Sequence, residues 1–152
     1  MKITHALLGE HGLFYAYLDA LEQRMDAADH GAVRVLAETL DALLRSHAQA
    51  EEDLLFPAMD DHVGEMGPLH IMRNEHQRID RLLDEIRDTD EDAAITPILL
   101  ELLELIHSHF HKEEAVLFHL ADQFVDEAKL NDMGQQWAKL RKVDLEASGC
   151  AA

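Results

Sequence analysis

The segments SHAQAEEDLLF, residues 46–56, and SHFHKEEAVLF, residues 108–118, decide the fold of this chain. They agree at six of eleven positions, although they lie 62 residues apart. Each carries a histidine followed four residues later by a glutamate, His47 with Glu51 and His109 with Glu113. A step of four places both side chains on one face of an α-helix, one turn apart. The repeat therefore predicts two helices that each present an imidazole and a carboxylate together.

Apolar residues recur at steps of three and four along four stretches of the chain, as in amphipathic helices. No run alternates with period two, and aromatic residues make up only 5% of the chain, so strands are not expected. The apolar face of each predicted helix contains a histidine. The predicted buried positions are Leu7, His11, Phe14, Leu18, Leu21, Met25; Val33, Leu36, Leu40, Leu43, His47, Ala50, Leu54; Met72, His76, Ile79, Leu83, Ile86; and Leu102, Leu105, His109, Glu113, Val116, Leu120.

Local signals place the helix ends. Thr4 and Asp29 are predicted to cap the first two helices, and Gly67-Pro68 and Thr96-Pro97 to open the third and fourth. Pro57 and residues 59–67 are expected to break the chain between its halves, and residues 89–94 to separate the last two helices.

The predicted fold class is all-α, an up-down-up-down four-helix bundle over residues 1–125. Residues 126–152 are expected to add a C-terminal helix, from about Asn131 to Glu146, that packs on the bundle or on a partner. Trp137 and Leu140 are its apolar residues.

A second repeat relates the two halves. Glu10-His11 is matched by Glu75-His76, 65 residues later, as His47 is matched by His109. The bundle is therefore expected to be two copies of one helical hairpin packed about a pseudo-twofold axis. A helix rises about 1.5 Å per residue, so the early histidines of ascending helices and the late ones of descending helices share one level near one end.

Two ionised glutamates buried at that level would repel each other and lose several kcal/mol of hydration each, unless cations compensate them. A metal site is the economical explanation. Six ligands without a thiolate exceed a tetrahedral zinc site and suit iron or manganese. Two glutamates on opposite hairpins can each bridge a pair of metals, which leaves two histidines and an open coordination position for each metal.

These residues give the chain a resemblance to a known family. His11, the pair His47 and Glu51, His76, and the pair His109 and Glu113 resemble the H, HxxxE, H, HxxxE pattern of hemerythrin-like, or HHE cation-binding, domains over about residues 5–120. The resemblance implies a non-haem di-iron centre with an oxo or hydroxo bridge, for which manganese or zinc are possible substitutes. It assigns His11 and His47 to one iron, His76 and His109 to the other, and Glu51 and Glu113 as bridges.

The sequence departs from the oxygen-carrying members of that family. They use a fifth histidine one turn before the third-helix histidine, where this chain has Met72. The pattern is closer to relatives with a symmetric four-histidine site, and for these the resemblance implies peroxide decomposition, response to oxygen or nitric oxide, or iron-centre repair. Repair proteins also carry a carboxylate just before the third-helix histidine, as Glu75 stands here.

Several further residues are candidates for the surroundings of the site. Glu10, Glu52, Glu75 and Glu114 are expected either to face solvent or to hold ligand histidines. Tyr15 and Asp80, one turn after His11 and His76, can point at open coordination positions, or else pack and form a surface ion pair. Met72 is a candidate pocket residue. The remaining histidines are expected at the surface, in caps or in loops: His5, His30, His62, His70, His107, His111 and His119.

Composition excludes other classes of partner. The chain has 152 residues, enough for one domain, and a net charge of −18, which opposes binding to nucleic acid or to an anionic membrane surface. Cys150 is the single cysteine, and no apolar run at the N-terminus is long enough for a signal peptide or a membrane span. A cytoplasmic monomer or homodimer that binds a small molecule, namely O2, NO or H2O2, is expected.

Three functions remain open from sequence. The first is peroxide decomposition or a redox stress response by a catalase-like or peroxidase-like di-iron centre. The second, without turnover, is reversible binding or sensing of O2 or NO, or iron handling and repair. The third is a metal-free interaction module. Ferritin-like bundles use Glu-x-x-His pairs, and Glu104 with His107 is the single match; haem would lack a Cys-x-x-Cys-His attachment.

Overall fold

Four long helical rods form the body of the protein. The computed structural model describes residues 1–63 and 67–145, and within these residues it contains helices and turns but no strand. The elements are α1 (Ile3–Asp26), α2 (His30–Ala50), η1 (Glu51–Leu55), α3 (Phe56–Val63), α4 (Pro68–Asp88), α5 (Asp92–Lys112), η2 (Glu113–Leu117), α6 (Phe118–Phe124) and α7 (Glu127–Arg141). The backbone stays helical across the joins, so α2, η1 and α3 make one rod, and α5, η2 and α6 another.

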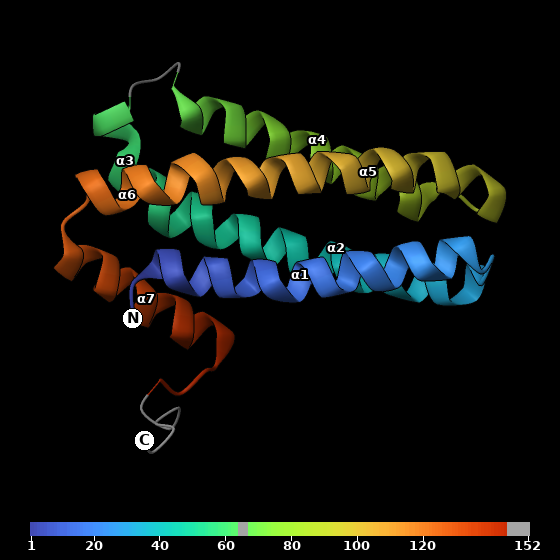
Figure 1. The fold of residues 1–152 in the computed structure, drawn as a ribbon, viewed down its shortest axis with the longest axis horizontal. Coiled ribbons are helices and arrows are strands. Elements are labelled where there is room, and N and C mark those ends of the chain that lie inside the picture. Colours follow the sequence, from blue (N-terminus) through green and yellow to red (C-terminus); the bar gives the residue numbers. More distant parts are fainter. Residues whose placement is uncertain (64–66, 146–152) are drawn as a thin grey trace.

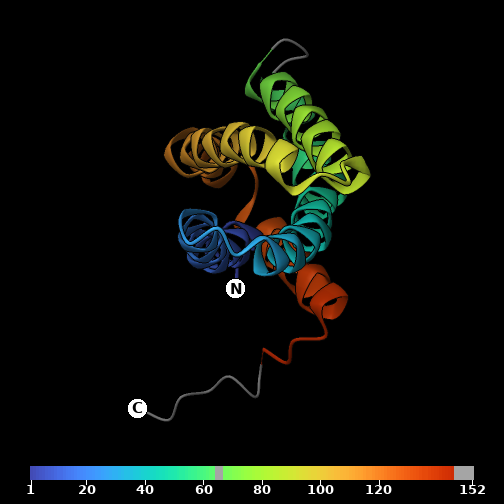
Figure 2. The same cartoon turned by 90° about the vertical axis from the view of Figure 1, so that its right-hand side faces the viewer.

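The rods pack as the up-down-up-down bundle predicted from the sequence (Figures 1 and 2). α1 packs against α2 and α5, and α4 packs against α5 and α2. α7 lies outside the four rods and packs on α1. None of the helices in the described part of the chain is long and apolar enough to span a membrane.

The core is divided into two apolar clusters with a polar layer between them. One cluster, near α3 and α6, includes Leu7, Ala50, Met72 and Leu117. The other fills the long shaft of the bundle, from Phe14, Leu44, Ile79 and Phe110 to the far end. His11, His47 and His76 fall between these two sets of positions on their rods, and Glu113 does so on the last rod. The two clusters therefore isolate that layer from water at both ends.

A π-helical turn follows each repeated glutamate. The N–H of Phe56 donates to the carbonyl of Glu51, and the N–H of Phe118 to that of Glu113, five residues back in each case. Such turns add a residue to the helix and occur mostly at functional sites. They shift the buried stripe by one position, because Leu117 is 1% exposed whereas Val116 is 46% exposed. The predicted burial of Val116 is therefore wrong.

The same shift occurs in the other rod. Leu54 is half-buried, while the next residue, Leu55, is fully buried. The rod also continues through Pro57 to Val63, so the predicted break at Pro57 is wrong. The helix tolerates Pro57 because the preceding π turn already interrupts the regular hydrogen bonds that a proline would remove.

The shifted stripe makes a direct prediction for stability. Leu117→Ala should destabilise the protein by about 2–5 kcal/mol, because it leaves a cavity in the core. Val116→Ala, one residue earlier, should change stability by less than about 0.5 kcal/mol, because its side chain is exposed. Chemical denaturation of both variants measures the difference. Equal losses would contradict the described position of the π turn.

Two of the predicted helix starts are confirmed. Asp29 caps α2, its carboxylate accepting from the N–H of Ala32 at 3.2 Å. Pro68 stands at the start of α4 after Gly67. The prediction for Thr4 is wrong, because α1 starts at Ile3 and the Thr4 hydroxyl instead donates to Asp122 at 3.3 Å.

The start of α5 also differs from the prediction. The helix begins at Asp92, so Thr96-Pro97 does not open it and Pro97 lies inside. Arg34 explains the early start, because its guanidinium donates to the carbonyls of Thr89 and Asp90 and to the Asp92 carboxylate. These contacts close the turn after α4 within a few residues.

The C-terminal helix is displaced towards the N-terminus relative to the prediction. α7 starts after Asp126, whose carboxylate accepts from the N–H of Ala128 at 2.8 Å, and it ends before Lys142 in the left-handed conformation. Trp137 is buried, but Leu140 is exposed, so the expected packing holds for Trp137 alone. Glu146 and Cys150 lie outside the described residues.

Candidate metal centre

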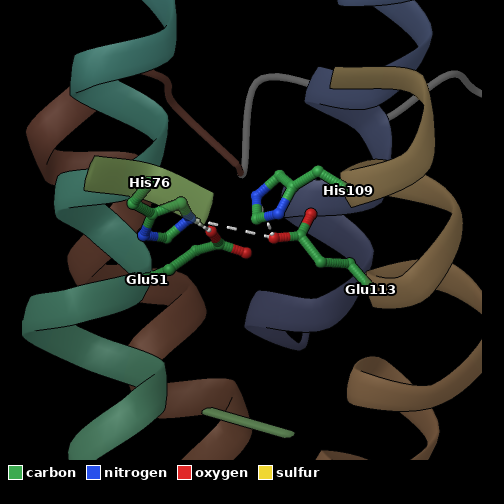
Figure 3. Close-up of side chains that lie close together, drawn as sticks. All are labelled: Glu51, His76, His109 and Glu113. Carbon is green, nitrogen blue, oxygen red and sulfur yellow. Dashed lines mark ion pairs between the residues drawn. The ribbon is translucent and has the colours of Figure 1, made fainter. Parts of the chain in front are cut away.

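Six polar side chains converge in the layer between the apolar clusters. They are the residues of the two sequence repeats, His11, His47, Glu51, His76, His109 and Glu113, and all are buried. α1 and α4 supply one histidine each, and each long composite rod supplies a histidine and a glutamate. In Figure 3, Glu51 and His76 face His109 and Glu113 across the bundle.

The inward atoms are the Nε2 atoms of the histidines and the carboxylate oxygens. Glu113 lies closest to the others, its Oε2 at 3.1 Å from His11 Nε2 and its Oε1 at 2.8 Å from His109 Nε2. Glu51 approaches His76 Nε2 at 3.2 Å and His47 Nε2 at 3.8 Å, through different oxygens. Each carboxylate therefore reaches at least one histidine from each hairpin.

These atoms separate into two overlapping groups of potential ligands. Glu51, His76, His109 and Glu113 offer atoms within 4.8 Å of one another, and so do His11, His47 and Glu113. Glu113 belongs to both groups. The pairing of the histidines is the one that the sequence resemblance implies, and the shared carboxylate is the arrangement expected of a bridging ligand.

The residues fit a metal on physical grounds. Both oxygens of Glu51, both oxygens of Glu113 and Nε2 of His76 are buried without a hydrogen-bond partner in the described part of the chain. Buried polar atoms without partners are rare, because each costs about 1–3 kcal/mol or more when charged. Imidazole and carboxylate donors, without a thiolate, suit iron or manganese. Cation binding explains why these potential ligand atoms lack hydrogen-bond partners and cluster at one point.

Aromatic rings wall the cluster. Phe110 stacks on His11 with 4.0 Å between ring centroids and contacts the edge of His47 at 5.7 Å. Phe56 stacks on His76 at 5.7 Å. These rings keep the imidazoles in place and exclude water, which strengthens electrostatic interactions in the layer.

A ring of outer glutamates holds the four histidines. Each of the four rods contributes one glutamate, which accepts from the Nδ1 of the histidine on the next rod around the bundle. The pairs are Glu10 with His47 at 2.7 Å, Glu52 with His76 at 3.1 Å, Glu75 with His109 at 3.0 Å, and Glu114 with His11 at 2.8 Å. Because Nδ1 carries the shared proton, the lone pair of Nε2 is directed inward, as metal binding requires.

The carboxylates also set the charges of the metal-free site. Burial lowers the pKa of His47, but the charges of Glu51 and the hydrogen bond to Glu10 outweigh it and raise the pKa to about 10. The pKa of His76 and that of His109 are each raised to about 9 for similar reasons. Burial raises the pKa of Glu10, but its bonds with His47 and Arg141 dominate and lower it to about 2. Protons on histidines therefore balance buried carboxylates in the absence of metal.

The outer ring gives a prediction for metal affinity. Glu75→Gln removes the negative acceptor on His109 while keeping the size of the side chain, and should weaken iron binding by about 10–100-fold. Glu101→Gln, on an exposed residue that pairs with Arg78, is the matched control and should leave the affinity unchanged. Anaerobic titration with ferrous iron measures both. Equal affinities would show that the outer glutamates do not support the ligands.

The structure places the other candidate residues around this site. Tyr15 donates to Glu114 at 3.0 Å rather than entering the inner cluster, and burial together with Glu114 raises its pKa to about 12. Asp80 forms an ion pair with Arg45 at 2.9 Å. Met72 is buried in the apolar cluster near α3. The remaining histidines, His5, His30, His62, His70, His107, His111 and His119, are exposed, as predicted.

A polar groove between α2 and α4 leads towards the site. It has a volume of about 450 Å³ and is lined in part by Glu52, Arg73, His76 and Asp80. Beneath it lies a small cavity of about 10 Å³ that shares His76 and Asp80 with the groove and reaches His47 and His109. His76, at 7% exposure, is the most exposed of the four inner histidines.

Sequence reasoning missed the residues that hold the outer glutamates. Arg73 donates to Glu52 at 3.2 Å, and Lys112 to Glu75 at 2.7 Å. Trp137 and Arg141 of α7 donate to Glu10 at 3.0 and 2.6 Å. The position of Lys112 directly before Glu113 marks it in the sequence as a residue near the site. The contacts from α7 join residues more than 120 positions apart, so nothing in the local sequence indicates them.

A helical bundle with a buried, symmetric layer of histidines and glutamates is a metal-binding bundle. Residues 2–121 match the hemerythrin HHE cation binding domain, and the chain therefore belongs to the hemerythrin family, as its sequence motifs indicate. No solved structure gives a significant match.

Curated relatives carry a more particular name. The chain is 32% identical to the iron-sulfur cluster repair protein YtfE of Enterobacter sp. (strain 638), over 63% of this chain and 51% of that protein. It is 31% identical to the protein of that name from Escherichia coli (strain K12 / DH10B) and from Shigella boydii serotype 18, over 49% of this chain and 40% of theirs. The chain thus spans about half the length of these relatives or less.

Proposed function

We propose that this chain binds two irons between its four rods and handles iron for the repair of iron–sulfur clusters. The proposed ligands are His11 and His47 for one metal and His76 and His109 for the other, with Glu51 and Glu113 shared. The observation that carries the proposal is the position of His76 between the buried cluster and the groove. A cation can reach this edge of the site without unfolding of the bundle.

The charged residues around the groove support passage of a cation. Its two arginines, Arg45 and Arg73, are each paired with carboxylates, most of which lie on adjacent helices. These carboxylates outnumber the arginines and are Asp41, Asp80 and Asp84 around Arg45, and Glu52 and Asp60 around Arg73. The surroundings therefore carry net negative charge, which raises the local concentration of cations.

The protein's own residues perform three tasks in this proposal. The outer glutamates keep the proton on Nδ1, so that each Nε2 presents a lone pair. Glu51 and Glu113 supply negative charge to both metal positions, and the phenylalanines exclude bulk water. Bound iron would supply redox and Lewis-acid chemistry at the open coordination positions.

The repair function is proposed by analogy with the named relatives, and an assay of cluster recovery would test it directly. Purified protein loaded with ferrous iron without oxygen is mixed with a hydratase whose [4Fe–4S] cluster has lost iron. The expected result is faster recovery of hydratase activity than with the same concentration of free ferrous iron. Recovery no faster than with free iron would overturn the proposal. Protein carrying Glu113→Gln is the control and should give no acceleration.

The small inner cavity favours a second candidate function. A volume of about 10 Å³ holds about one water-sized molecule, and it lies against His47, His76 and His109. Peroxide, O2 or NO fits such a space better than a larger substrate. Oxygen evolution from peroxide by the iron-loaded protein would support a catalase-like enzyme, whereas a stable spectral change with NO or O2 would support binding without turnover.

A further inference from the structure

One outer glutamate is held from outside the bundle. Glu10 accepts from Trp137 Nε1 at 3.0 Å and from Arg141 Nε at 2.6 Å through its Oε1. Its Oε2 accepts from His47 Nδ1 at 2.7 Å and from Arg141 Nη2 at 3.3 Å. Trp137 and Arg141 belong to α7, which lies beyond the family match at residues 2–121. A helix outside the family domain thus reaches an inner histidine through a single carboxylate.

The other outer glutamates have partners within the four rods. Glu52 is held by Arg73 of α4, Glu75 by Lys112 of α5, and Glu114 by Tyr15 of α1. In the described part of the chain, these three contacts lie within the four rods and do not involve α7. The His11 and His47 half of the site is therefore the half that depends on where α7 lies.

Close packing fixes α7 against the start of α1. Gly134 has no room for a side chain, because a Cβ there would overlap the carbonyl oxygen of Met1. Leu130, Met133 and Ala138 are buried in the apolar cluster near α3. Arg141 also donates to the carbonyl of Ser46, one residue before His47. The orientation of the Trp137 and Arg141 side chains is thus set by the docking of the whole helix.

We propose that Trp137 and Arg141 are positioning residues for His47, and that docking of α7 is coupled to metal binding at the His11 and His47 half of the site. The inference rests on the proposed metal centre, but not on repair activity. Coupling is reciprocal: a docked α7 favours metal binding there, and metal binding there favours the docked α7. For a protein that handles iron, undocking of α7 would weaken one metal position and spare the other.

The first test is a titration with ferrous iron, without oxygen, of the full chain and its variants. Arg141→Gln and Trp137→Phe should weaken one of the two binding steps by about 10–100-fold and leave the other within about twofold. Gly134→Ala, which displaces the helix without touching Glu10, should do the same. Lys139→Gln, on an exposed position of α7, is the matched control and should bind as the parent protein does.

A second measurement uses Trp137 as a probe, because it is the single tryptophan. Zinc, which does not quench fluorescence, should shift the emission of Trp137 on binding to the parent protein, and the shift should vanish in Glu10→Gln. Circular dichroism spectra of all variants check that the bundle is folded.

The outcomes separate the two proposals. Two metals bound by the parent with unchanged binding in all three α7 variants, or with both steps weakened equally, would overturn the coupling and leave the repair function standing. The expected titration together with no acceleration of cluster recovery would overturn the repair function and leave the coupling standing. Absence of metal binding by the parent protein would overturn both.

Discussion

Glu113→Gln should abolish stable binding of iron, with the content falling from two metals per chain to less than one. Glu113 is the residue common to both groups of potential ligands, and its two oxygens lie at 3.1 and 2.8 Å from His11 and His109. The amide keeps the size of the side chain but removes the negative charge that both proposed metal positions would share. Loss of an outer glutamate alone weakens such sites by about 10–100-fold, so loss of this inner carboxylate should exceed about 100-fold.

The measurement is metal analysis after anaerobic loading and dialysis. Glu104→Gln, an exposed glutamate on the same rod, is the control and should retain the parent's iron. The helical content of Glu113→Gln should match that of the parent, because the change removes a buried negative charge without altering volume. Full iron content in the folded variant would show that Glu113 does not contact the metals.

The convergence of the site follows from sequence because it depends on local helix geometry. A four-residue step between His47 and Glu51, or between His109 and Glu113, fixes the two side chains on one face wherever the helix goes. The spacing of the paired Glu-His motifs then fixes the level of each histidine in an antiparallel bundle. The burial of all six residues at one level can therefore be predicted without knowing the angles between the helices.

Other features depend on nonlocal contacts and could not be read from the sequence. Which glutamate holds which histidine depends on the order of rods around the bundle, as in Glu114 with His11, 103 residues apart. Arg34, on α2, determines the start of α5, so a propensity rule applied to Pro97 fails. The π turn after Glu113 changes the phase of the stripe, and regular steps of three and four therefore misplace Val116.

Removal of metal should give the second large effect, a fall in thermal stability. A ligand at 1,000 times its dissociation constant stabilises the folded state by about 4 kcal/mol per site, and each kcal/mol changes the Tm of a chain of this length by about 2–4 °C. Two bound irons should therefore raise the Tm by roughly 15–30 °C over the metal-free protein. The metal-free protein retains its two apolar clusters and should still unfold cooperatively.

The size of that stabilisation should depend on pH. In the metal-free protein the pKa of His47 is raised to about 10, and those of His76 and His109 to about 9, against 6.5 for an unperturbed histidine. Because the folded values are the higher ones, their contribution to metal-free stability is fully present below about pH 6.5 and is lost as the pH rises through 9 to 10. Metal binding displaces these protons, so affinity should rise with pH over the same range.

Both linkages act in one direction, so the difference in Tm between loaded and metal-free protein should widen between about pH 6 and pH 8. Calorimetric scans without oxygen, with and without ferrous iron, measure that difference. The protons released on loading at neutral pH, counted with a weakly buffered indicator, check its cause. A difference in Tm that narrows with rising pH, or loading without proton release, would mean that the inner histidines are already neutral before metal arrives. The outer glutamates would then have to hold neutral imidazoles, and the charge of Glu51 and Glu113 would need another cation.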